Sequence, residues 1–348
     1  MRFDELLAIH RRHFLMGAGA AGAAAMMPGS AFAQGKTVVV GTWGGDYQNL
    51  LEENISKPLL APKGVPVQYD VGNAPPRKNK LIAERRLPRG TQDVVGLSDI
   101  DMYEMSLANV LEKLDTSKFA NSKNLIPALA KDYAAPHIYS GLVLVYNPNH
   151  ADPKGFADMW DPRYAGKVGF ADGLYIQNIN AAALVAGGDR SNFEPGKAKM
   201  MELKKAGARV YPSNEAVAAA LQSGEIWMTP MWRARAFQWA SGGIPVKDIA
   251  PKEGITPILF EMAVPRNSQN KDAAYEFLQA MLEPKAQGGF AQKMGYVPTV
   301  NNAPLSPDLE QKLTFTAEEQ KRFIVPDYDY IAKNNNALRE WWQRDVLG

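Results

Sequence analysis

The chain has 348 residues, contains no cysteine, and carries 39 Lys and Arg against 37 Asp and Glu. The absence of cysteine excludes disulfides, thiol nucleophiles and cysteine metal sites. The near-neutral charge gives no support for a nucleic-acid-binding protein, which usually has a basic excess on one face. Only His137 and His150 lie beyond the N-terminal leader described next, so we expect no metal site and no cofactor.

The N-terminus has the order of an export signal. Paired arginines at 11–12 precede a small, apolar stretch at 17–27, and the sequence Ala-Phe-Ala at 31–33 has the form of a signal peptidase site. We therefore predict a twin-arginine-like signal peptide over 1–33, cleaved after Ala33, and a periplasmic location. Export by the Sec route and an uncleaved anchor are the alternatives, although the apolar stretch is short for about 30 Å of hydrocarbon.

Short β-branched runs alternate with amphipathic segments in the first part of the mature chain. We predict strands at 36–41, 65–69 and 93–96, and helices at 46–55, 77–86 and 101–111. Strands that alternate with helices in this way predict an α/β fold with an open, mostly parallel sheet.

A second α/β set follows later in the chain. We predict strands at 141–146, 168–171, 225–228 and 258–264, and helices at 176–185, 216–221 and 271–282. Two such sets joined by strands predict two lobes with a cleft between them. Ligands of open parallel sheets bind beyond the carboxyl ends of the strands, which points to the loops after these strands.

Six segments, in order, carry a family resemblance across essentially the whole mature chain. They are GTWGGDYQ (41–48), QDVVGLSD (92–99), MWDPRYAGKVGFAD (159–172), SGEIWMTPMWRARAF (223–237), PKEGITPILFEMAVPRNSQNKDAAYEFLQAML (251–282) and MGYVPTVNNA (294–303). In this series the chain resembles the periplasmic solute-binding proteins of ABC importers, specifically the spermidine/putrescine-binding group.

The resemblance implies a type II two-lobe fold that closes on a solute between its lobes. Lobe one would comprise 36–142 and 233–303, and lobe two 143–232 and 304–348. It also implies a monomer without enzyme activity that delivers a small organic solute to an ABC permease in the inner membrane.

The resemblance and the loop positions together select the candidate ligand-binding residues. Trp43 and Trp232 match positions at which aromatic rings flank the alkyl part of the solute, and tryptophan faces also attract ammonium groups. Core packing is the alternative for each of these tryptophans. The other candidates at the cleft are Gly44, Ser98, Asp99, Asp172, Tyr175 and, more weakly, Tyr296.

Two acidic positions that the polyamine-binding group uses have lost their charge here. The Trp-x-Asp pattern of the group falls on residues 258–260, which are Ile, Leu and Phe. Glu261 follows one residue later, and alternation along a strand would point it to the other face. A second acidic pair keeps only Asp172, because Tyr175 or Ile176 stands at its other position.

Two arginines, Arg233 and Arg235, stand instead where the group has a neutral turn. Guanidinium groups bind carboxylate or phosphonate oxygens bidentately, and Asp99 offers a place for one amine. We therefore predict a polyamine-like amine or an amino-acid derivative with an anionic group as the solute. The alternative is that both arginines pair with surface acids, which contributes about 0–1 kcal/mol per pair.

Two other functions use the same fold. A periplasmic hydrolase or lyase would use Asp99 and Asp172 as acid and base, and a chemoreceptor partner would dock to a sensor rather than to a permease. The alternating acids and tyrosines at 327–330 are predicted to pack and to cap a helix, because iron-binding relatives need adjacent tyrosines.

Overall fold

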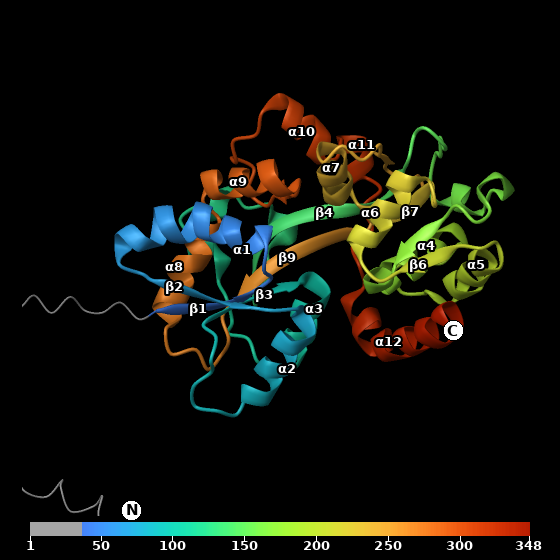
Figure 1. Ribbon diagram of the computed structural model, residues 1–348. Helices are drawn as coiled ribbons and strands as arrows, with labels where there is room; N and C mark the ends of the chain where they lie inside the picture. The colour runs from blue at the N-terminus through green and yellow to red at the C-terminus, as the bar shows by residue number, and fades with distance from the viewer. Residues whose placement is uncertain (1–36) are drawn as a thin grey trace, which may run out of the picture. The chain divides into compact units, whose positions relative to one another are not determined.

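The computed structural model describes residues 37–348, so the predicted signal peptide and its cleavage site lie outside the described residues. Residues 37–348 form two α/β lobes that share the long strands β4 (Ala135–Tyr146) and β9 (Pro257–Ala263) (Figure 1). Within this range, no helix combines the length and the apolar composition that a membrane crossing requires.

The first lobe is built on a sheet with the strand order β10-β4-β9-β3-β1-β2. Its other strands are β1 (Val38–Thr42), β2 (Val67–Val71), β3 (Val94–Ser98) and β10 (Val297–Pro298). β1 pairs in parallel with β2 and β3, whereas β9 is antiparallel to both β3 and β4. The predicted two-lobe α/β fold is confirmed, but the sheet is mixed rather than mostly parallel, because β9 returns from the second lobe and runs against its neighbours.

Helices cover both faces of this sheet (Figure 1). They are α1 (Asp46–Leu51), which continues as a π-helical segment to Leu60, α2 (Ala74–Glu84), α3 (Asp99–Leu107), α8 (Lys271–Met281) and α9 (Pro284–Met294). Val38 and Val40 of β1 pack with α1, α8 and α9 on one face. Val95 and Leu97 of β3 pack with α2 and α3 on the other face, as the two-residue period of a strand requires.

The second lobe begins where β4 changes its partners. Up to Gly141 this strand pairs with β9, and from Leu142 it pairs with β7 (Met228–Trp232) and then β8 (Lys247–Ile249). β5 (Gly169–Ala171) and β6 (Arg209–Tyr211) form a parallel pair beside β7. The helices of this lobe are α4 (Tyr175–Val185), α5 (Glu194–Lys205), α6 (Asn214–Ser223) and α12 (Tyr328–Trp341), which extends as a π-helical turn to Leu347.

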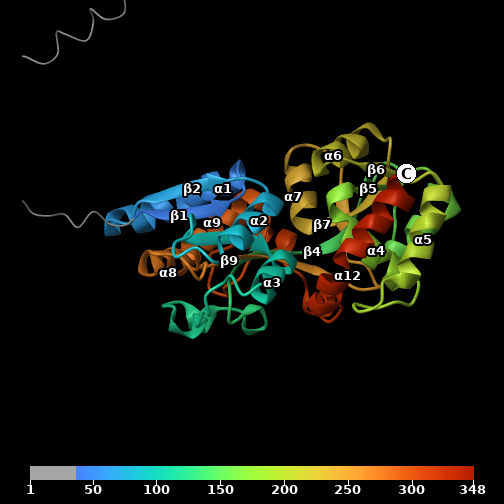
Figure 2. The same cartoon turned by 90° about the horizontal axis from the view of Figure 1, so that it is seen from below.

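Three more helices lie above the crossing strands in Figure 1: α7 (Arg233–Ser241), α10 (Pro307–Leu313) and α11 (Ala317–Gln320). α7 is attached to the first lobe, since Ala234 N donates to Ser140 Oγ at 3.1 Å and Gln238 Nε2 donates to the Met294 carbonyl at 2.7 Å. On the other side of the crossing, α12 of the second lobe approaches α3 of the first (Figure 1 and Figure 2).

The close packing of α5 on α4 gives a stability prediction at Gly196. A Cβ added there would lie 2.3 Å from the Ile179 carbonyl oxygen and 2.7 Å from the Ala183 nitrogen. Alanine normally favours a helix over glycine by about 1 kcal/mol, but here we expect Gly196→Ala to lower the free energy of unfolding by about 2 kcal/mol through overpacking. Urea unfolding measures it. Gly173→Ala is the matched control, because its Cβ would meet nothing within 4 Å, and equal midpoints for the two variants would contradict the prediction.

Candidate functional site

A cavity of about 310 Å³ lies at the carboxyl end of β1, where the β1–α1 turn faces α7 and β9. We call it the Trp43 pocket. It brings together four of the predicted residues, Trp43, Gly44, Arg235 and Tyr296. Its other lining residues are Asp46, Tyr47, Ile138, Gln238, Phe260 and Met294. The ligand-binding role of the four predicted residues stays a prediction.

The wall of the Trp43 pocket is aromatic and held in place. The Trp43 ring meets Tyr47 and Phe260 edge-on, each with centroids 5.2 Å apart, and Phe260 meets Tyr296 in the same way at 5.4 Å. The Tyr47 hydroxyl is hydrogen-bonded to Nδ1 of His137 at 2.7 Å, and burial lowers the pKa of His137 to about 3, which keeps it neutral. This aromatic wall therefore presents an uncharged surface suited to the carbon skeleton of a solute.

Arg235 adds an unfilled donor to this pocket. Its Nη1 donates to Gln238 Oε1 at 2.9 Å, while its Nε is buried and has no hydrogen-bond partner among residues 37–348. The only carboxylate recorded near it in that range is Glu215, 4.0 Å away on a side chain that is 74% exposed. Buried N–H groups are rarely left unpaired, so this donor is an unusual feature of a residue that lines the pocket.

A second guanidinium, which the sequence did not single out, contacts Trp43. Arg77 of α2 is buried, and its Cζ lies 4.8 Å from the centroid of the Trp43 ring. Its Nη2 donates to the Gly72 carbonyl at 2.6 Å, and its Nη1 donates to the Gly96 carbonyl. No sequence pattern indicates this contact, because α2 and the β1–α1 turn meet only through the fold.

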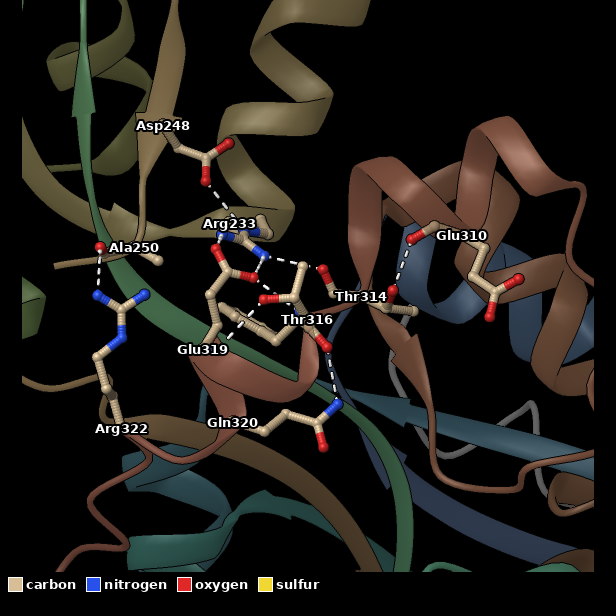
Figure 3. A network of polar contacts seen from close by, with 10 residues as sticks. Arg233, Asp248, Ala250, Glu310, Thr314, Thr316, Glu319, Gln320 and Arg322 are labelled. Atoms are coloured by element: carbon tan, nitrogen blue, oxygen red, sulfur yellow. Dashed lines mark hydrogen bonds and ion pairs between the residues drawn. The ribbon is translucent and has the colours of Figure 1, made fainter. Parts of the chain in front are cut away.

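Arg233 lies in a network of polar contacts (Figure 3), and only Ala234 separates it from Arg235 in the sequence. Arg233 Nε donates to Asp248 at 2.9 Å, and Nη2 donates to Glu319 at 3.0 Å. Nη1 donates to the Thr314 carbonyl at 2.9 Å, and the guanidinium lies 3.9 Å from the Phe315 ring centroid. The network ties α7 to β8 and to the segment around α11. It matches the alternative that the arginine pairs with acids, but these acids are largely buried.

Trp232 and the second-lobe candidates do not line the Trp43 pocket. Trp232 is buried in the core of the second lobe, opposite Leu142. Asp172 accepts a hydrogen bond from Trp342 Nε1 at 2.8 Å, and the Tyr175 hydroxyl donates to Asn335. These side chains hold α4, α12 and the C-terminal turn together.

Ser98 and Asp99 stand at the start of α3, away from the lining of this pocket. Ser98 Oγ caps the helix by accepting from Asp101 N at 3.4 Å. Asp99 is 2% exposed and accepts the Tyr328 hydroxyl of α12 at 2.8 Å. Asp327 caps α12 by accepting from Tyr330 N at 2.9 Å, so the predicted packing and capping role of this segment is confirmed.

The two sides of β9 separate as the strand alternation predicts. Phe260 faces the Trp43 pocket, whereas the Glu261 carboxylate is fully buried and lies 2.9 Å from Lys131 Nζ. Burial, opposed by Lys131 and reinforced by Asp99, raises the pKa of Glu261 to about 7. Glu261 therefore does not replace the acid that is missing from position 260.

The comparison with known proteins agrees with this geometry. Residues 63–317, most of the chain, match the family described as bacterial extracellular solute-binding protein. The chain belongs to this family. The spermidine/putrescine-binding periplasmic protein of Escherichia coli (strain K12) is 28% identical over 272 residues, which cover 74% of each chain. The predicted family resemblance is therefore confirmed for this solute-binding protein.

Solved structures show the same fold. An ABC transporter structure from Clostridium perfringens ATCC 13124 is 22% identical, has a TM-score of 0.76, and covers 88% of this chain and 99% of its own. The structure titled Atu4243-GABA receptor is 21% identical, with a TM-score of 0.78 and coverage of 89% and 97%.

The Arg233 network predicts a stability effect. Removing one partner of a buried ion pair leaves an uncompensated charge, which costs about 3–5 kcal/mol. Because Asp248 and Glu319 keep 24% and 20% side-chain exposure, we expect Arg233→Met to lower the free energy of unfolding by roughly 2–4 kcal/mol. Lys312→Met is the control, because Lys312 forms an exposed ion pair with Asp308. This substitution should change the free energy of unfolding by less than about 1 kcal/mol. Urea unfolding measures both variants. Equal decreases in their free energies of unfolding would contradict a stabilising role of the Arg233 network.

Glu261 predicts a pH dependence of stability in this solute-binding protein. Its folded pKa of about 7 lies above the ordinary value of 4.5, so the folded state binds the extra proton between these two values. Stability should therefore fall as the pH rises from about 4.5 to 7, by roughly 3 kcal/mol from this group. In Glu261→Gln the free energy of unfolding should decrease less over this pH range. Urea unfolding at pH 5 and pH 7.5 tests this, and an equal decrease in wild type and variant would contradict it.

Proposed function

We propose that this chain is the periplasmic solute-binding component of an ABC importer, which binds a small organic solute with an anionic group in the Trp43 pocket. It would act as a monomer and deliver the solute to a permease in the inner membrane. Its family membership and the export signal expected at its N-terminus support this role. A relative that is 28% identical is named a spermidine/putrescine-binding periplasmic protein, which supports a small organic solute.

The buried, unpaired Nε of Arg235 carries the proposal for an anionic group. A carboxylate or phosphonate would complete the hydrogen bonding of that guanidinium and neutralise its charge. The aromatic wall of Trp43, Phe260 and Tyr296 would contact the carbon skeleton. Asp46 is exposed and is the only acid that lines the pocket among residues 37–348, so it would accept one amine of an amino-acid derivative.

A solute that contacts both lobes would shift the equilibrium toward the closed form, which the permease would recognise. We propose lobe boundaries at 142/143, 232/233 and 303/304. The change of β4 partners after Gly141 supports the first of these boundaries.

The test is a thermal-shift screen of polyamines, amino-acid derivatives, aminophosphonates and sugar acids, followed by calorimetry. Ligand at about 100 times its dissociation constant adds roughly 2.7 kcal/mol of stability. We expect an anionic compound to give the largest shift, and Arg235→Gln to weaken it about tenfold or more, since a charge-assisted hydrogen bond is lost.

Arg163→Gln is the matched control, because that arginine is 74% exposed and pairs with Asp161 on the surface. If putrescine or spermidine gives the largest shift, and Arg235→Gln leaves the affinity for that polyamine unchanged, the proposal of an anionic solute group is wrong. Recovery of the solute unchanged, checked by NMR, separates binding from hydrolysis or elimination.

A further inference from the structure

Arg77 is a buried charge without a carboxylate partner. It is 4% exposed, and its two recorded hydrogen bonds go to the backbone carbonyls of Gly96 and Gly72. Among residues 37–348 no carboxylate lies within ion-pair distance of it. The acids that influence its charge are already paired, Asp70 with Lys80 and Asp101 with Lys78, each at 2.7 Å.

Such an arrangement is energetically costly. Burial of a charge is strongly unfavourable unless an opposite charge or a full set of hydrogen bonds accompanies it. Burial lowers the pKa of Arg77 only to about 10, so the guanidinium is still charged at neutral pH. The two carbonyl bonds do not neutralise that charge, because a carbonyl oxygen carries only a partial negative charge. The positive charge itself therefore calls for another explanation.

Its position supplies one. The guanidinium lies 4.8 Å from the Trp43 ring centroid, within the range of a cation–π contact with that ring. Arg235 lines the same pocket, and its charge opposes the rise that burial causes in the pKa of Tyr296. Two guanidinium groups thus flank the aromatic wall, against the single exposed carboxylate of Asp46. Because Arg77 is buried, water and salt screen its field weakly.

We propose that Arg77 is a specificity-determining residue of the Trp43 pocket, whose uncompensated charge behind Trp43 favours anionic solutes and disfavours ammonium groups. This inference rests on the proposed function of the pocket. It adds a source of selectivity that does not touch the solute and that differs from direct pairing with Arg235.

The test uses Arg77→Gln, which removes the charge and keeps one neutral amide donor group on a shorter side chain, and Arg77→Lys, which keeps the charge. Calorimetry compares three solutes of the same four-carbon length: succinate, 4-aminobutyrate and putrescine. Wild type should prefer succinate or 4-aminobutyrate to putrescine. We expect Arg77→Gln to reduce that preference about tenfold and Arg77→Lys to retain most of it. Equal weakening of all three solutes by Arg77→Gln would show a structural role only and would overturn the proposal.

A measurement without solute gives an independent readout. Iodide is an anionic quencher of tryptophan fluorescence and caesium is a cationic one. The quenching of Trp43 is obtained as the difference between each protein and the same protein with Trp43→Phe. Loss of the Arg77 charge should lower the iodide-to-caesium ratio of the quenching constants at Trp43 about twofold or more. An unchanged ratio in folded Arg77→Gln overturns the proposal. A lowered ratio supports it even if none of the three solutes binds wild type, in which case the proposed solute class fails instead.

Discussion

The structure depends on one strand that belongs to two sheets. β4 forms its ladder with β9 up to Gly141 and with β7 and β8 from Leu142. Because a strand satisfies its backbone groups only through its neighbours, this exchange of partners fixes where one lobe ends and the other begins. β9 must then return beside β4, which makes the first sheet mixed and places Phe260 against Trp43. The Trp43 pocket is a consequence of this crossing.

Three arginines near the crossing illustrate how the surroundings decide the role of a charge. Arg233 is neutralised by two acids, so its charge serves the attachment of α7 to β8 and α11. Arg235 has one neutral partner, an exposed glutamate 4.0 Å away, and one buried N–H without a partner. Arg77 is buried and has hydrogen bonds only to carbonyls. The degree of neutralisation, rather than the presence of a guanidinium, separates Arg233 from the two arginines that we propose act on a ligand.

The acids that the polyamine pattern would supply are absent from the Trp43 pocket or are engaged elsewhere in the fold. Phe260 replaces a charge with an aromatic edge, and Glu261 next to it faces Lys131 on the opposite side of β9. Asp99 is likewise occupied by Tyr328. Within residues 37–348, the Trp43 pocket is therefore lined by aromatic rings, one guanidinium and one exposed carboxylate.

The sequence by itself determined the family, the alternating α/β elements, the two-lobe fold, and the side of β9 on which Glu261 lies. These follow from local periodicity and from the order of motifs, which do not depend on distant contacts. Only the tertiary structure separated Arg233 from Arg235, buried Trp232 in the second lobe, bonded Asp99 to Tyr328, and brought Arg77 to Trp43. The reason is that burial and pairing of a side chain depend on partners far away in the chain, such as Glu319 for Arg233.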